Sequence, residues 1–238
     1  MAVGSYLKCK RYIDSHSVKV ELPVKRKIYP VVTITRETGA GVQMVCKELI
    51  KLLEDISDED GINWTYFDRE LIYKVIEDHN LPQQLREFMK EDKNKPVKSM
   101  VYEILGLHPS HWTLLHKTTE TVLQLARMGK AIIVGRGSNI ITAKMKNAFH
   151  LRLVAPMEDR IQHVMEFTNL SRSNAVDFIK REEAQRRRYL KSNFSEDVRN
   201  PHIYHLIINT GLMSYKEAAR VIANTLVDRY PDVFSTGE

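Results

Sequence analysis

At 238 residues, with 43% hydrophobic and 28% charged residues, the chain has the size and composition of one globular domain with room for an insertion. Its net charge of +6 favours polyanionic partners, and both nucleotides and nucleic acids qualify. No apolar run reaches the roughly 18 residues of a membrane span, and the first residues are too polar for a secretory signal. The two cysteines, Cys9 and Cys46, lie in unrelated contexts, so we expect a cytoplasmic protein without membrane contact and without a disulfide or metal framework.

Residues 1–27 form a basic extension ahead of the first predicted strand, and residues 28–238 form the domain itself. The positive charges of the extension are Lys8, Lys10, Arg11, Lys19, Lys25, Arg26 and Lys27. Such a run is typical of a solvated arm. A contact with nucleic acid is the alternative.

Residues 31–35 are a β-branched run that predicts a buried parallel strand. A loop with two glycines, Gly39 and Gly41, follows it, and apolar residues at helical spacing then predict a helix from Val42 to Leu53. A strand, a glycine loop and a helix aim backbone N–H groups and the positive end of a helix dipole at one point. The stretch is therefore either a phosphate site or a plain strand-to-helix turn.

This loop departs from the phosphate-loop pattern G-x-x-x-x-G-K-[ST]. Val42 stands where the lysine belongs, and Gln43 and Met44 stand where the hydroxyl belongs. The loop alone therefore does not decide between the two interpretations.

A second strand is predicted over residues 64–67, and Asp68 opens the helix that follows it. Asp68 is either the N-cap of that helix or a binding residue. Residues 81–112, with three prolines and a charged run, are expected to form a helical insertion with a mobile middle. Regular spacing returns in a helix over residues 113–128.

The most apolar strand, residues 131–134, ends in Gly135-Arg136-Gly137. An arginine between two glycines at the end of a buried strand marks either a surface turn or a phosphate clamp. Further strands are predicted over residues 149–154 and 204–209. Alternation of five strands with helices predicts a parallel sheet covered on both faces, with ligands at the carboxyl ends of its strands.

The remaining helices are predicted over residues 157–167, from Ser171 onward, and over residues 215–227. The second of these is dense in charge, with four arginines within eight residues: Arg181, Arg186, Arg187 and Arg188. A charged helix is usually a solvated face. This density also fits a lid that closes over phosphates.

Five stretches resemble, in this order, segments of the cytidylate kinase-like branch of the nucleoside monophosphate kinases: TRETGAGVQMV, FDRELIYKVI, IIVGRGSNI, FIKREEAQRRRY and IINTGLMS. The first resembles an altered phosphate loop that already lacks the usual lysine. The resemblance covers residues 30–228. It implies a three-layer P-loop kinase fold, with a five-stranded parallel sheet, an acceptor region near residues 66–130 and a helical lid near residues 180–195.

The reaction that the resemblance implies is transfer of the γ-phosphoryl group of ATP, with Mg²⁺, to CMP, dCMP or a related acceptor. The residues matched to the donor phosphates are Thr38, Gly39, Ala40, Gly41, Val42 and Gln43. The residues matched to the acceptor are Asp68, Arg69, Tyr73, Lys74, Arg136, Glu183 and Arg186. The catalytic cations would be Arg36, Arg136, Arg186 and Arg187, with Arg36 supplying the charge of the missing lysine and the lid arginines swinging in.

Departures from the family pattern leave three functions open. Gly137 stands where cytidylate kinases carry an aspartate that reads the acceptor, Arg69 replaces a serine, and Lys74 replaces a bidentate arginine. The first hypothesis is an active small-molecule kinase. The second is a nucleotide-binding protein that kept the fold and lost turnover, and the third is a basic nucleic-acid binder.

Overall fold

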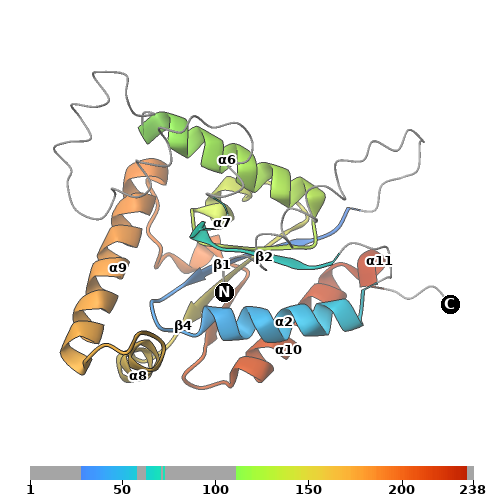
Figure 1. Ribbon diagram of the computed structural model, residues 1–238. Helices are drawn as coiled ribbons and strands as arrows, with labels where there is room; N and C mark the ends of the chain where they lie inside the picture. Colours follow the sequence, from blue (N-terminus) through green and yellow to red (C-terminus); the bar gives the residue numbers. More distant parts are fainter. Residues whose placement is uncertain (1–27, 58–62, 71, 73–110, 235–238) are drawn as a thin grey trace.

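The protein is a three-layer α/β domain, seen in a computed structural model that describes residues 28–57, 63–70, 72 and 111–234 (Figure 1). One parallel sheet holds the strands β1 (Val31–Arg36), β2 (Thr65–Phe67), β3 (Ala131–Val134), β4 (Ala148–Val154) and β5 (Leu206–Asn209). Each overlaps a strand predicted from the sequence, which confirms the α/β parallel fold. The strand predicted to begin at residue 204 begins later, because a short 3₁₀ helix, η1 (Pro201–Ile203), precedes it.

The strand order is β2-β3-β1-β4-β5, which places β1 in the middle of the sheet. Val31 lies beside Ala131 of β3 and beside Ala148 of β4, and the same parallel register continues along all three strands. Because all strands run the same way, their carboxyl ends meet at one edge. The segments that follow β1, β3 and β4 are therefore neighbours in space, although they are far apart in the sequence.

Helices cover both faces of the sheet (Figure 1). α2 (Val42–Asp55), α10 (Tyr215–Arg229) and the short α11 (Pro231–Phe234) cover one face, and α6 (His111–Met128) and α7 (Ser138–Ile141) cover the other. The apolar residues of α2 recur every three or four positions, so they form one buried stripe against Val32 and Ile34 of β1. On the opposite face, Val31 packs with Val122 and Leu125 of α6.

Two further helices, α8 (Met157–Thr168) and α9 (Arg172–Phe194), lie at the edge where β1 and β4 end (Figure 1). The Ser171 side chain caps α9 by accepting a hydrogen bond from the Asn174 backbone N–H at 3.4 Å. α9 then runs without interruption through the stretch predicted as a lid. Its first half packs on α8 through a small core of Ile161, Val164, Ala175 and Ile179.

The face of the sheet beneath α7 becomes polar toward β4. Thr33 and His150 are buried there, and the Thr33 hydroxyl lies 2.8 Å from Nδ1 of His150. The His205 ring lies 4.9 Å from the His150 ring, and Nδ1 of His205 accepts a hydrogen bond from the His150 backbone N–H. Burial, followed by the neighbouring His205 and Arg229, lowers the pKa of His150 from 6.5 to about 4.

We expect the free energy of unfolding to fall as the pH is lowered from about 6.5 toward about 4. The unfolded chain binds a proton at His150 in this range and the folded protein does not, and the pKa difference corresponds to about 3 kcal/mol. Urea unfolding at pH 7.5 and pH 4.5 measures the effect, which His150→Gln should reduce. His202→Gln, on η1, is the control, and an unchanged pH dependence in His150→Gln would contradict the assignment.

Several predicted features lie outside the described residues. They are the basic extension 1–27, most of the insertion 81–112, and the candidate acceptor residues Tyr73 and Lys74. Among the helices that the structure describes, none has the length and apolarity needed to cross a membrane. α7 and α11 had not been predicted from the sequence, since four residues are too few to show a helical period.

Candidate functional site

The loop between β1 and α2 has the geometry of an anion cradle. Gly39 and Gly41 adopt left-handed backbone conformations with φ of 89° and 71°, and Gly41 is the N-cap of α2. The Ala40 N–H donates to the Glu37 carbonyl at 3.2 Å. Within the described residues, no acceptor takes the backbone N–H groups of Gly39, Gly41, Val42 and Gln43. These four amides and the dipole of α2 favour a negatively charged group in this loop.

Both glycines of the loop are required by close packing as well as by φ. A Cβ at Gly39 would lie 2.6 Å from the Arg160 carbonyl oxygen, and a Cβ at Gly41 would lie 2.2 Å from the ring of Tyr215. α8 and α10 therefore hold the loop from outside.

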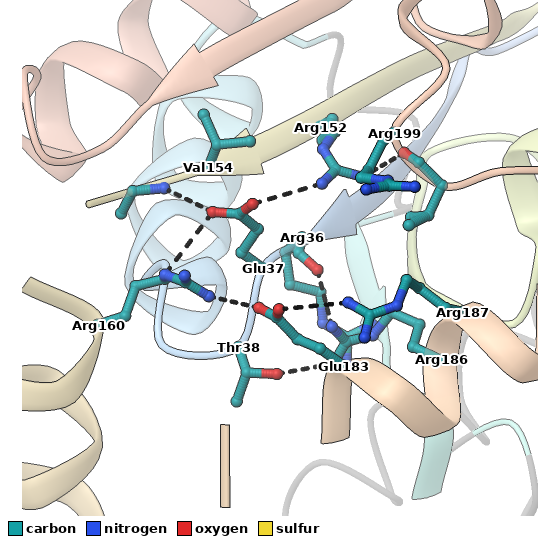
Figure 2. Close-up of polar contacts among 12 residues, drawn as sticks. Arg36, Glu37, Thr38, Arg152, Val154, Arg160, Glu183, Arg186, Arg187 and Arg199 are labelled. Carbon is teal, nitrogen blue, oxygen red and sulfur yellow. Dashed lines mark hydrogen bonds and ion pairs between the residues drawn. The ribbon is translucent and has the colours of Figure 1, made fainter. Parts of the chain in front are cut away.

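Arg186 of α9 lies on this loop (Figure 2). Its guanidinium donates to the Arg36 carbonyl at 3.0 Å and to the Thr38 hydroxyl at 3.2 Å. Burial, with a further contribution from the Arg36 charge, lowers the pKa of Arg186 to about 10. Since Val42 leaves the loop without a lysine, α9 places a cation beside a loop that has none of its own.

Arg36, the last residue of β1, holds a second cation at the same edge. Burial is the main cause that lowers its pKa, the charge of Arg136 lowers it further, and Asp68 acts in the opposite direction. Among the described residues, no hydrogen bond or ion pair joins the Arg36 guanidinium to a partner. A Cβ added at Gly135 would lie 2.5 Å from Nη1 of Arg36, and the φ of 81° at this position also favours glycine in the loop after β3.

Gly135→Ala should displace the Arg36 side chain and lower the free energy of unfolding by about 1–3 kcal/mol. Both the new methyl group and the φ of 81° at Gly135 contribute. Chemical denaturation measures the change, and Arg36→Ala in the same background should recover the part that comes from the collision. No recovery would show that backbone strain alone is responsible.

Two glutamates connect the loop to its surroundings (Figure 2). Glu37 pairs with Arg152 at 3.5 Å and with Arg160 at 3.7 Å, and it accepts a hydrogen bond from the Ala155 backbone N–H at 3.2 Å. Glu183 of α9 pairs with Arg160, and it also pairs with Arg187 at 3.9 Å. The carboxyl edge is therefore linked by ion pairs that join the loop after β1 to β4, α8 and α9.

A cavity of about 40 Å³ lies inside this network. Its charged lining consists of five arginines and two glutamates: Arg36, Arg152, Arg186, Arg187, Arg199, Glu37 and Glu183. The excess of positive charge, partly removed from water, favours an anionic ligand over a neutral one.

Comparison with known proteins identifies the fold family. The model of the cytidylate kinase-like family matches residues 31–212, which is more than half of the chain. The chain belongs to the cytidylate kinase-like family. The family resemblance expected from the sequence is thereby confirmed, and with it a kinase-like fold.

The individual proteins that this chain resembles have low sequence identity to it. An uncharacterized protein from Eubacterium ventriosum superposes with a TM-score of 0.62 at 17% identity, covering 84% of this chain and 99% of that one. A shikimate kinase from Bacteroides thetaiotaomicron has a TM-score of 0.45 at 13% identity, covering 84% and 96%. A curated uronate isomerase from Corynebacterium glutamicum is 24% identical over 118 residues, which are 50% of this chain and 23% of that protein. The chain thus spans about a quarter of that relative.

The other predicted site residues that the structure describes lie around the same edge. Arg136 has a left-handed φ of 57°, and its guanidinium lies 5.5 Å from the centre of the Tyr189 ring on α9. Asp68 follows β2, and its carbonyl accepts a hydrogen bond from the Ile72 N–H at 3.0 Å, as at the start of a helix. Arg69 is exposed. Arg36, Arg136, Arg186 and Arg187 are therefore all brought to one edge of this cytidylate kinase-like domain.

Four residues of the network had not been singled out in the sequence: Glu37, Arg152, Arg160 and Arg199. Arg152 carried a usable signal, because an arginine within a buried parallel strand needs a partner. Among the described residues, no group of three His, Cys, Asp or Glu side chains is placed to hold a metal ion.

Proposed function

We propose that this member of the cytidylate kinase-like family is a phosphotransferase that moves the γ-phosphoryl group of ATP to CMP, dCMP or a related acceptor. One observation carries the proposal: Arg186 is hydrogen bonded to the lysine-free phosphate loop, next to four backbone amides that have no described acceptor. Phosphoryl transfer requires positioning and positive charge rather than covalent help from the protein. This edge offers both.

In the proposed reaction, an oxygen of the acceptor phosphate forms a bond to the γ-phosphorus while the bond to the β,γ-bridging oxygen breaks. The products are ADP and the acceptor diphosphate. The amides from Gly39 to Gln43 would hold the donor phosphates, and Arg36 and Arg186 would stabilise the charge on the transferring group. Arg136 and Lys74 would bind the acceptor phosphate, and Arg187 would add a cation from α9.

The acceptor itself rests on the family resemblance alone. At Gly137, where cytidylate kinases carry an aspartate, a Cβ would lie 2.5 Å from the ring of Phe194. An aspartate there would strain the backbone and require the Phe194 ring to move, so we propose that another residue reads the acceptor. Candidates on the described chain are Asp68 and Glu183.

Mg²⁺ would bind as part of the ATP complex. The loop has no hydroxyl at Gln43 or Met44, and no described carboxylate group forms a ligand set. The described residues thus suit the anionic nucleotide better than the metal ion. ATP as donor and the free, buried thiol of Cys46 both fit a cytoplasmic protein.

Binding and turnover can be tested separately. Calorimetric titration with ATP and Mg²⁺ measures affinity, and ATP at 100 times its Kd should raise the free energy of unfolding by about 2.7 kcal/mol. A coupled assay for ADP with CMP, dCMP, UMP, AMP and GMP then measures turnover. ADP release that depends on one of these acceptors supports the proposal, and the absence of ATP binding would refute it.

A second candidate is a nucleotide-binding protein that has lost turnover. The missing lysine and hydroxyl favour it, because charge lost from a phosphoryl-transfer site costs orders of magnitude in rate. ATP binding without ADP release in the same assay would select it. Affinity for RNA that falls steeply with added salt, without any effect of nucleotide, would select the nucleic-acid binder instead.

A further inference from the structure

Arg160 of α8 has a position that the reaction itself does not explain. Only 9% of it is exposed, and a Cβ added at Gly39 of the phosphate loop would lie 2.6 Å from its carbonyl oxygen. Its guanidinium lies between the carboxylates of Glu37, in the loop, and Glu183, on α9 (Figure 2). One side chain thus connects the loop, α8 and α9.

Glu183 precedes Arg186 by three residues, which is close to one turn of a helix. An ion pair that holds Glu183 therefore also sets the height and rotation of the turn that carries Arg186. Arg186 makes its two hydrogen bonds to the loop from this turn. Without Arg160, the remaining described ion-pair partner of Glu183 is Arg187, whose side chain is 49% exposed.

We propose that Arg160 is a positioning residue that holds Glu183, and through it Arg186, over the phosphate loop. The proposal rests on the proposed function for its nucleotide, but the coupling between α8, the loop and α9 is a property of the protein alone. Arg160 Nε is buried and makes no hydrogen bond within the described residues, although it lies 3.7 Å from Glu37. Arg160 therefore holds Glu183 by a hydrogen bond from Nη1 and attracts Glu37 through its charge, and a lysine would serve two carboxylates less well.

A double-mutant cycle tests whether Arg160 affects ATP binding through Arg186. Arg160→Met should weaken ATP binding about tenfold, and it should have almost no further effect in an Arg186→Met background, because both changes remove the same contact. Arg160→Lys should restore part of the affinity. Losses that add in the double variant would overturn the proposal, because Arg160 would then act independently of Arg186.

Arg172→Met is the matched control. Arg172 also links α8 to α9, through an ion pair with Glu158, but both side chains are exposed, and no hydrogen bond or ion pair among the described residues joins either of them to the loop. We expect ATP affinity within about twofold of the wild type, as for other exposed pairs. A loss equal to that of Arg160→Met would show that general attachment of α9, and not the position of Arg186, is responsible.

Hydrogen exchange without nucleotide separates this inference from the proposed function. Arg160→Met should speed exchange of the backbone amides around residues 183–187, and Arg172→Met should not. Faster exchange in a protein that binds no ATP would refute the proposed function and leave the coupling intact. ATP binding with unchanged exchange and affinity in Arg160→Met would refute the coupling.

Discussion

Arg186→Met is expected to lower the kcat of phosphoryl transfer by about 10³-fold or more, which is the scale of losing a cation that stabilises the transferring group. Methionine has a similar length and fills the space without a charge. The loop would then keep its amides, but Val42 provides no replacement for the lost guanidinium. Steady-state kinetics with saturating ATP and acceptor measure the effect.

Arg188→Met is the matched control for this change, because Arg188 is an exposed arginine of the same helix. Its kcat should remain close to that of the wild type. Arg186→Met loses two hydrogen bonds but also relieves repulsion with Arg36, so we expect its free energy of unfolding to change by only about 1 kcal/mol. Equal losses of rate in the two variants would contradict the role given to Arg186.

Gly39→Ala should destabilise the protein by about 3–5 kcal/mol and abolish nucleotide binding. A φ of 89° strains any residue with a side chain, and the new Cβ would lie 2.6 Å from a backbone oxygen of α8 that cannot rotate away. The loop must therefore move, and its amides with it. Chemical denaturation and ATP titration measure the two effects.

Gln43→Ala provides the comparison for Gly39→Ala. The Gln43 side chain is exposed and its backbone amide is unchanged by the substitution. Wild-type affinity for ATP is expected if the loop binds phosphate through its backbone. A large loss in Gln43→Ala would show that the side chain contributes and would call for a different account of the loop.

The fold was predictable because its strands are short and apolar. The segments between them have apolar residues at helical intervals. Val31, Ile132 and their neighbours are buried from both sides, so their segments contain little besides β-branched residues. The sequence did not predict α7, and it extended the last strand back to residue 204. Both differences concern three or four residues, where capping by Asn200 or a turn after Gly137 outweighs hydrophobic pattern.

The candidate site was predictable only where a local motif marked it. The glycines of the loop, Arg136 between its glycines, and the arginines of α9 all stand out in the sequence. Glu37 and Arg160 do not, because their partners are brought to them by the fold and not by spacing, and Arg152 shows only that it needs a partner, not which one. The sequence also favoured Arg36 as the substitute for the missing lysine, whereas Arg186 is the residue hydrogen bonded to the loop.

The central place of β1 has a consequence for biosynthesis. Its two neighbours, β3 and β4, begin at residues 131 and 148, so β1 leaves the ribosome roughly 5 to 20 s before either can join it. During that delay a β-branched segment has both edges open to other nascent chains. A chaperone that recognises short extended apolar segments would act on residues 31–35, and a fragment that stops short of β4 would leave this strand permanently without one neighbour.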